Sequence, residues 1–222
     1  RVSTGARLLL DESGLPVAYV PTVRNLEKFI ADQDIRVVLY VNQNTRNFQM
    51  FRYGRRWHVF INHGESDKMY MTTNQFKAYD YSLIAGDAAR ERLGRALWDF
   101  DFDKRAIPIG RPQADYYAGV LPYTPDERTV VLYAPTWRDD RTEIVEFAGA
   151  RELAADLGDD VVVLVRGHSR TLLPGRDAEG TRVIDVTGFP DTTRLLLAAD
   201  ALVTDYSSVM FDFSATGKPM YF

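Results

Sequence analysis

The sequence contains no cysteine, which excludes disulfide bonds and thiolate chemistry. It also has no apolar run close to the roughly 18 residues that a membrane-spanning helix needs. Positive charge is not in excess, because 27 lysines and arginines stand against 31 aspartates and glutamates, for a net charge of −4. Phosphate backbones attract basic faces, so this balance argues against nucleic acid as a partner.

Several familiar catalytic motifs are missing as well. No Gly-x-Gly-x-x-Gly follows an apolar run, and there is no phosphate-loop Gly-Lys-Ser/Thr, no Gly-x-Ser-x-Gly and no His-Glu-x-x-His. These absences argue against a dinucleotide dehydrogenase, a P-loop ATPase, a lipase and a zinc protease. The alternating Asp99, Asp101 and Asp103 lack a surrounding cluster of oxygen ligands, so we predict a solvated loop with buried phenylalanines there.

What the chain does have is a regular alternation of short apolar runs and segments with helical periodicity. Several runs are apolar on both faces, which is typical of parallel strands covered by helices on two sides. The sequence therefore predicts an α/β fold of two Rossmann-like halves with parallel sheets. Strands are expected at residues 17–20, 37–42, 57–62, 82–85, 105–109, 129–134, 161–165, 182–185, 201–204 and 219–222. Helices are expected at residues 25–32, 87–97 and 191–199.

Residues 120–128 are the best candidate for a linker, because they include Pro122 and Pro125 among charged residues. We therefore expect one half at residues 1–122 and the other at 123–222. Both ends of the sequence look cut, since the last apolar run stops as it forms. This pattern predicts a piece of a longer protein with a truncated C-terminal half.

Ligands of open parallel sheets bind at the carboxyl ends of the strands, so residues that follow strands deserve most weight. His63 and Gly64 follow the run 57–62. Histidine can transfer protons near neutral pH, and glycine permits a close approach of the backbone to a ligand. A turn histidine bonded to the backbone is the alternative. We interpret His58, which lies inside the same strand, as structural.

Arg166 and His168 follow the run 161–165 and lie two residues apart. In an extended segment they point the same way, and together they suit a phosphate. The alternative is a surface arginine in a polar loop. Ser207 and Ser208 follow the run 201–204 at the expected start of a helix, where hydroxyls and free N–H groups attract anions. The alternative there is a helix cap that only stabilises the fold.

The motifs occur together in a characteristic order. They are His63-Gly64 with Lys68, Tyr-Ala-Pro-Thr-Trp-Arg at 133–138, Arg166-Gly167-His168, and Thr-Asp-Tyr-Ser-Ser-Val-Met-Phe-Asp-Phe at 204–213 followed by Lys218-Pro219. This set resembles the CDP-glycerol glycerophosphotransferase family, the teichoic acid primases and polymerases of bacteria. The resemblance extends from about residue 37 to residue 222, and the motifs at 133–138 and 204–213 are its specific part.

The resemblance implies a GT-B architecture, with two halves facing a central cleft. The C-terminal half would hold the nucleotide donor and the N-terminal half would lie on the acceptor side. It also implies transfer of glycerol phosphate, or a related polyol phosphate, from a CDP-linked donor to a lipid-linked or polymeric acceptor hydroxyl. CMP is released, and no metal or cofactor takes part. The implied location is cytoplasmic, with peripheral contact to the inner face of the plasma membrane through parts outside this chain.

The resemblance also implies roles for individual residues. His63 would be the general base on the acceptor hydroxyl, and His168 would be the second catalytic residue. Arg166, His168, Ser207 and Ser208 would hold the pyrophosphate and stabilise the leaving CMP, and we expect His63, His168 and Ser207 to line one cleft. The remaining expected substrate-binding residues are Gly64, Lys68, Thr136, Arg138 and Asp205.

Two other functions stay open from the residues alone. A GT-B glycosyltransferase that uses a UDP- or GDP-sugar would share the fold and the diphosphate-binding residues, but its reaction would release a nucleoside diphosphate instead of CMP. A non-catalytic nucleotide-binding module would keep its cellular function when His63 is replaced by alanine.

Overall fold

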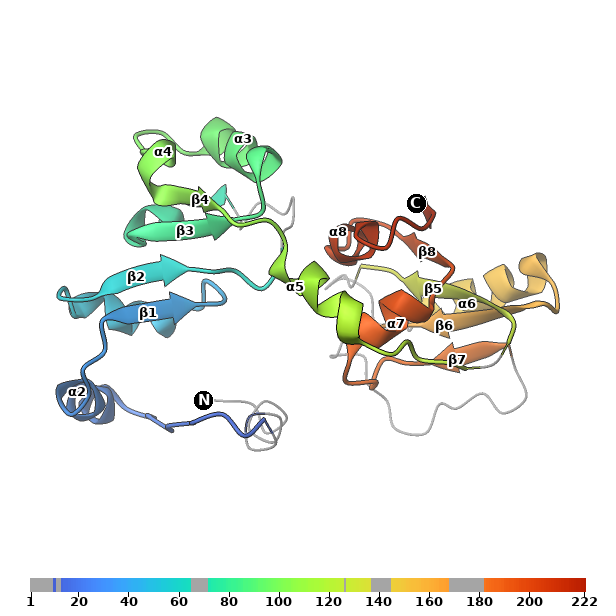
Figure 1. Ribbon diagram of the computed structural model, residues 1–222, viewed down its shortest axis with the longest axis horizontal. Helices are drawn as coiled ribbons and strands as arrows, with labels where there is room; N and C mark the ends of the chain where they lie inside the picture. The colour runs from blue at the N-terminus through green and yellow to red at the C-terminus, as the bar shows by residue number, and fades with distance from the viewer. Residues whose placement is uncertain (1–9, 11–12, 65–71, 126, 137–144, 168–181) are drawn as a thin grey trace. The chain divides into compact units, whose positions relative to one another are not determined.

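The computed structural model describes residue 10 and residues 13–64, 72–125, 127–136, 145–167 and 182–222 (Figure 1). These residues form two compact units, one built around each of two β-sheets. The strand pairs described below are parallel and alternate with helices along the chain, which confirms the predicted α/β class. Among the described helices, none combines the length and the apolar character that crossing a bilayer requires.

The first sheet has four strands in the order β1-β2-β3-β4. Their bounds are Val37–Tyr40, Trp57–Phe60, Tyr81–Ile84 and Ala106–Pro108. Strand β2 pairs in parallel with both β1 and β3. Side chains on one face alternate into an aromatic core, where Tyr40 and Phe60 contact the ring of Tyr79. This core fixes the end of β2, and therefore the start of the loop that carries His63.

Short helices precede and connect the strands of this sheet along the chain. They are α2 (Val23–Ala31), η1 (Asn47–Arg52), η3 (Asn74–Ala78), α3 (Asp87–Ala96) and α4 (Phe102–Arg105). The helices predicted at 25–32 and 87–97 correspond to α2 and α3. Asp101 caps α4 by accepting a hydrogen bond from the amide of Lys104, and Phe100 is buried. The prediction of a loop at the aspartate run is therefore wrong for Asp101 and Asp103, which cap and enter α4, whereas the burial predicted for the phenylalanines holds for Phe100.

The second sheet has five parallel strands in the order β7-β6-β5-β8-β9. Their bounds, from β5 to β9, are Thr129–Ala134, Val161–Val165, Val183–Asp185, Ala201–Thr204 and Met220–Tyr221. The chain starts in the middle with β5, moves outward to β7, and returns to the other side of β5 with β8. The strand order therefore reverses between β5 and β8, and such a switch point is where ligands of open α/β sheets bind.

Helices cover both faces of this sheet. On one face, α7 (Thr192–Ala198) and α8 (Val209–Ser214) pack Leu195 and Phe213 against Leu132 and Leu164. On the other face, α6 (Val145–Leu157) packs Ala150 and Ala154 against the strands. A connecting segment with α5 (Pro112–Asp115) and η4 (Tyr116–Gly119) precedes β5. Burial on two faces explains why these strands are apolar at nearly every position.

The prediction of a strand at residues 17–20 is wrong. The chain there forms neither strand nor helix, and Val17 and Tyr19 are exposed. Pro16 and Pro21 flank the run and donate no backbone hydrogen bond, so β-forming residues alone do not give it a partner strand. The other predicted strands correspond to β1–β9 with shifts of one or two residues at some ends. The expected division of the chain at residues 122 and 123 stays a prediction.

Candidate functional site

The loops that follow β5 and β8 are tied together at the switch point of the second sheet. The amide of Thr136, just after β5, donates a 2.6 Å hydrogen bond to Oδ1 of Asp205, just after β8. One residue earlier on β8, the buried hydroxyl of Thr204 donates to the carbonyl oxygen of Ala134 at 2.6 Å. The motif at 133–138 and the motif at 204–213 therefore meet where the topology predicts a ligand.

Polar and aromatic groups are available at this edge. The Thr136 hydroxyl oxygen is buried and has no hydrogen-bond partner among the described residues. A buried hydroxyl without a partner is costly in a folded protein, so a bound ligand is one way to satisfy it. Tyr206 is 79% exposed and therefore takes no part in the core. An exposed aromatic ring in the loop after β8 can stack on a flat ligand group.

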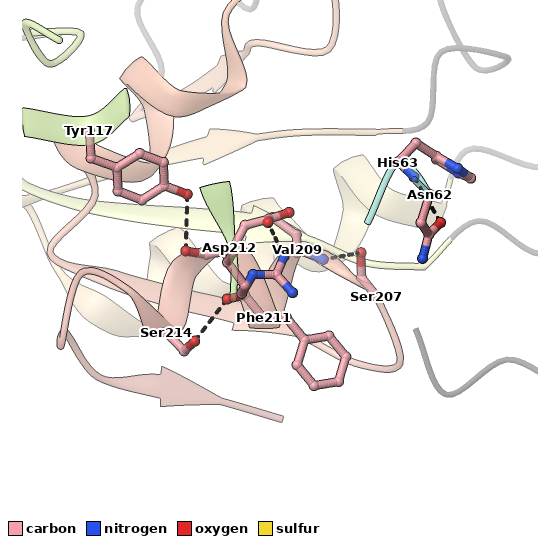
Figure 2. A network of polar contacts seen from close by, with 9 residues as sticks. Asn62, His63, Tyr117, Ser207, Val209, Phe211, Asp212 and Ser214 are labelled. Atoms are coloured by element: carbon pink, nitrogen blue, oxygen red, sulfur yellow. Dashed lines mark hydrogen bonds and ion pairs between the residues drawn. The ribbon is translucent and has the colours of Figure 1, made fainter. Parts of the chain in front are cut away.

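Ser207 and Ser208 form the turn that leads into α8, as the sequence predicts. The hydroxyl oxygen of Ser207 accepts a long, 3.4 Å hydrogen bond from the amide of Val209 (Figure 2). Ser208 occupies the position before the helix, yet its side chain makes no capping hydrogen bond. The alternative of a purely stabilising serine cap therefore does not describe Ser208.

Arg166, at the end of β6, is bound to protein oxygens. Its guanidinium donates to the carbonyl oxygens of Val186, at 2.8 Å, and Phe189, and to the hydroxyl of Thr192 at 3.0 Å. Burial lowers the pKa of this guanidinium, and the Asp185 carboxylate partly offsets that effect. These contacts order the loop between β7 and α7. Direct contact of Arg166 with a pyrophosphate stays a prediction.

In the first unit, His63 follows β2 with a defined proton position. Its Nδ1 lies 2.7 Å from the carbonyl oxygen of Val41. A carbonyl can only accept, so Nδ1 carries the proton of this contact, and Nε2 of the exposed ring is the nitrogen left to act as an acceptor. A histidine in this tautomer can take a proton from a substrate hydroxyl through Nε2.

The backbone around His63 is unusual on both sides. Asn62 has a φ of 60° and accepts a 2.8 Å hydrogen bond from the His63 amide through Oδ1 (Figure 2). Gly64 has a φ of 151°, a region that side chains rarely allow. Strained backbone of this kind persists where surrounding contacts impose it, and it clusters at functional sites. Gly64 was among the predicted site residues and Asn62 was not, although Asn is one of the non-glycine residues that tolerate positive φ.

His58 is structural, as predicted. It is buried, its Nδ1 lies 2.7 Å from the Tyr40 hydroxyl, and its Nε2 lies 3.3 Å from the carbonyl oxygen of Tyr53. The carbonyl requires a proton on Nε2, so Nδ1 accepts from the tyrosine. This is the opposite tautomer to that of His63. Both nitrogens are occupied inside the protein, so His58 serves the core.

Three predicted site residues, Lys68, Arg138 and His168, lie outside the described residues. The expected grouping of His63, His168 and Ser207 therefore stays a prediction. Two residues that were not among the predicted site residues, Arg111 and Asp212, form an ion pair close to the Ser207–Ser208 turn. A signal existed for Asp212 alone, because it is a charge inside the otherwise apolar run Val-Met-Phe-Asp-Phe, but nothing in the sequence points to Arg111 as its partner.

Curated relatives of the chain include two staphylococcal teichoic acid enzymes. The chain is 31% identical over 203 residues to the teichoic acid glycerol-phosphate transferase of Staphylococcus aureus, a match that covers 85% of this chain and 47% of the relative. It is 32% identical over 169 residues to the teichoic acid poly(glycerol phosphate) polymerase of Staphylococcus epidermidis, covering 65% of this chain and 22% of the relative. The chain thus spans less than half the length of either relative.

A solved structure of the wall teichoic acid polymerase TagF superposes with a TM-score of 0.64 at 25% identity, over 96% of this chain and 60% of that one. The profile of the CDP-glycerol:poly(glycerophosphate) glycerophosphotransferase family matches residues 56–222, which is more than half of the chain and includes the loops after β2, β5, β6 and β8. The chain therefore belongs to the CDP-glycerol:poly(glycerophosphate) glycerophosphotransferase family.

Proposed function

We propose that the protein transfers glycerol phosphate from a CDP-linked donor to a hydroxyl of a growing cell-wall polymer and releases CMP. The observation that carries this proposal is the hydrogen bond between Asp205 and Thr136, which joins the two specific family motifs at the switch point of the second sheet. A nucleotide diphosphate suits this place, because it offers a flat base and two phosphates to an edge with hydroxyls, backbone amides and an exposed tyrosine.

Two hydroxyl groups at the edge of the second sheet support the binding of the donor's phosphates. Ser208 has a hydroxyl that makes no capping bond, and the Thr136 hydroxyl has no partner among the described residues, so both can donate to phosphate oxygens. Asp205 contributes by holding the Thr136 amide. We include Ser207 and His168 among the pyrophosphate contacts and Arg138 and Lys68 among the substrate contacts, in line with the family motifs.

The chemical step needs a base and a stabilised leaving group. In our proposal, Nε2 of His63 takes the proton of the acceptor hydroxyl as its oxygen attacks the phosphorus that carries glycerol. The bond from that phosphorus to the bridging oxygen breaks, and the electron pair stays on CMP, which leaves with the added negative charge. The Val41 carbonyl accepts a hydrogen bond from Nδ1, so Nε2 is the nitrogen that remains available to the acceptor hydroxyl in this proposal.

The activities of the two staphylococcal relatives support a choice of substrates for this protein. Both staphylococcal relatives act in teichoic acid synthesis with glycerol phosphate, so we propose CDP-glycerol as the donor and a lipid-linked or polymeric polyol phosphate as the acceptor. Such an acceptor places the reaction at the inner face of the plasma membrane. We propose that parts of the protein outside this chain provide any peripheral contact with that membrane.

The test is to incubate the purified protein with CDP-, UDP- and GDP-linked donors and a glycerol phosphate acceptor, and to identify the released nucleotide. Release of CMP from CDP-glycerol, dependent on acceptor, is the expected result. Release of UDP or GDP from a nucleotide sugar would replace the proposal with a glycosyltransferase. Absence of turnover together with tight nucleotide binding would indicate a binding module.

Replacing His63 by alanine separates catalysis from binding. A histidine base contributes about 10²–10⁴-fold to a rate, so kcat should fall by that order while the dissociation constant of CDP-glycerol stays within about two-fold. Replacing Ser208 by alanine should show the reverse pattern, with weaker donor binding and a smaller effect on kcat. Loss of donor affinity in the His63 variant would make His63 a binding residue and contradict its role as the base.

A further inference from the structure

Two residues of the connecting segment before β5 bind the same residue of α8, Asp212. The Arg111 guanidinium forms an ion pair and hydrogen bond with the Asp212 carboxylate. The Tyr117 hydroxyl donates to the backbone carbonyl of the same aspartate at 3.0 Å (Figure 2). Side chain and backbone of Asp212 are thus held by two different residues of the segment.

This ion pair is shielded from water more than an ordinary surface pair. The side chains of Arg111 and Asp212 are 19% and 30% exposed, and the guanidinium lies 5.9 Å from the centre of the Phe211 ring. Burial and the nearby Asp212 charge both raise the pKa of Tyr117, as expected for a phenol in the same shielded place. Removal of one charge would leave the other partly buried and unpaired, which is costly.

The position of α8 depends on such contacts. The helix has six residues, and an isolated helix of this length is not stable in water. It is fixed in the described structure by burial of Phe213 in the core on one side and by Arg111 and Tyr117 at Asp212. Asp212 is four residues after Ser208, one helical turn away, so movement at Asp212 is transmitted directly to the Ser207–Ser208 turn.

We propose that Arg111 is a positioning residue for the donor: through Asp212 it fixes α8, and with it the Ser207–Ser208 turn, in the arrangement that binds the diphosphate. This inference rests on the proposed function. Arg111 does not touch the substrate in this scheme. Gly110, directly before Arg111, has a φ of 71°, a backbone conformation that suits glycine.

The test compares Arg111→Ala, Asp212→Asn and the double variant with Asp159→Asn. Asp159 is a matched control, because its carboxylate also pairs with an arginine, Arg182 at 3.5 Å, but is 99% exposed. For each protein we would measure the dissociation constant of CDP-glycerol by calorimetry, the KM values of donor and acceptor, and hydrogen exchange of the α8 amides. Thermal unfolding would confirm that each variant is folded, and Arg111→Lys would replace Arg111→Ala if the latter does not fold.

We expect each single variant of the pair to raise the donor dissociation constant about ten-fold, with kcat and the acceptor KM nearly unchanged. The double variant should be no worse than either single one, because the two residues act as one pair. Exchange at Val209–Ser214 should accelerate in the pair variants and stay unchanged in Asp159→Asn. An unchanged donor dissociation constant in a folded Arg111→Ala protein would overturn the inference.

The same experiment separates failure of this inference from failure of the proposed function. If the unaltered protein binds no CDP-linked donor, the proposed function is wrong. The inference then fails as a statement about donor binding, while hydrogen exchange still reports whether Arg111 fixes α8. If the unaltered protein binds donor and only the acceptor KM responds to Arg111→Ala, the proposed function stands and the donor-positioning role is wrong.

Discussion

Oδ1 of Asp205 accepts a 2.6 Å hydrogen bond from the backbone amide of Thr136, although the two residues are 69 positions apart in the sequence. An ionised acceptor strengthens such a bond, so Asp205→Ala should lower the free energy of unfolding by about 1.5–3 kcal/mol. It should also weaken donor binding, because the loop after β5 loses its attachment to β8. Asp205→Asn keeps an acceptor oxygen and should lose less. Urea unfolding and calorimetry with CDP-glycerol measure both effects.

The chain offers a matched control at the opposite end of the same two strands. Oδ2 of Asp200, just before β8, accepts a 2.9 Å hydrogen bond from the amide of Val130 in β5. Asp200→Ala should therefore cost similar stability and leave donor affinity unchanged. Equal losses of donor affinity in the Asp200 and Asp205 variants would mean that only general destabilisation is being measured.

Arg166 should matter for stability as well as for any ligand. Because its guanidinium has two oxygen acceptors in the loop after β7 and one at the start of α7, Arg166→Ala should lower the free energy of unfolding by about 3 kcal/mol. Arg166→Lys should recover less than half of this loss, since one ammonium group cannot reproduce the fork of donors. Equilibrium unfolding in urea checks both. An Arg166→Ala protein with an unchanged free energy of unfolding would contradict the structural role derived from these contacts.

A second variant distinguishes loop ordering from direct contact with pyrophosphate. Thr192→Val removes one acceptor of Arg166 and leaves the guanidinium in place. If Arg166 acts by ordering the loop, donor affinity should fall in both variants in proportion to lost stability. If Arg166 contacts the pyrophosphate itself, Arg166→Ala alone should weaken donor binding, by about 1–3 kcal/mol.

The sheets could be predicted from the sequence because their physical signal is local. Strand β6 is Val-Val-Val-Leu-Val, apolar on both faces, and four of its five side chains are buried. The same signal at residues 17–20 was misleading, since strand formation also needs a partner strand. The Ser207–Ser208 turn and the catalytic candidate His63 were found for a related reason, because they directly follow strands.

Pairings between distant residues were not predictable in this way. Arg111 and Asp212 are 101 positions apart, and among 27 basic and 31 acidic residues no local pattern selects that pair. The Val41 carbonyl that fixes the His63 tautomer is also invisible in the sequence, because any residue has a carbonyl. Such contacts depend on which strands become neighbours, so they follow from the topology and not from residue type.

The buried hydroxyl of Tyr79 destabilises the core of the first unit. The side chain is fully buried, and its oxygen has no hydrogen-bond partner among the described residues. Tyr79→Phe should therefore raise the free energy of unfolding by about 1 kcal/mol, because an unsatisfied polar group leaves the core. Tyr40→Phe is the matched control: its hydroxyl bonds Nδ1 of His58 at 2.7 Å, so its loss should lower stability by about 1–2 kcal/mol.

Alkaline pH should enlarge the gain in unfolding free energy that Tyr79→Phe brings. Burial raises the pKa of Tyr79 from its ordinary value of 10.0 to about 12. The folded state therefore holds this proton more tightly than the unfolded state, and the associated stability is complete below pH 10.0 and is lost as the pH rises toward about 12. Phenylalanine removes this dependence. Thermal unfolding of both proteins between neutral pH and pH 11 or so should show a widening difference, and a constant difference would contradict the shifted pKa.

Gly149 in α6 is required by the ring of Tyr133. A β-carbon at this position would lie 2.7 Å from the Tyr133 hydroxyl oxygen and 3.4 Å from the ring carbon that carries it. Alanine normally stabilises a helix by about 1 kcal/mol relative to glycine, whereas overpacking costs about 1–3 kcal/mol, so Gly149→Ala should be destabilising overall. Gly94→Ala, in α3 with open space around the added carbon, should show the stabilising effect alone. In a Tyr133→Phe background the close contact is absent, so Gly149→Ala should become stabilising there; if it stays destabilising by urea unfolding, the contact with Tyr133 is not what requires glycine.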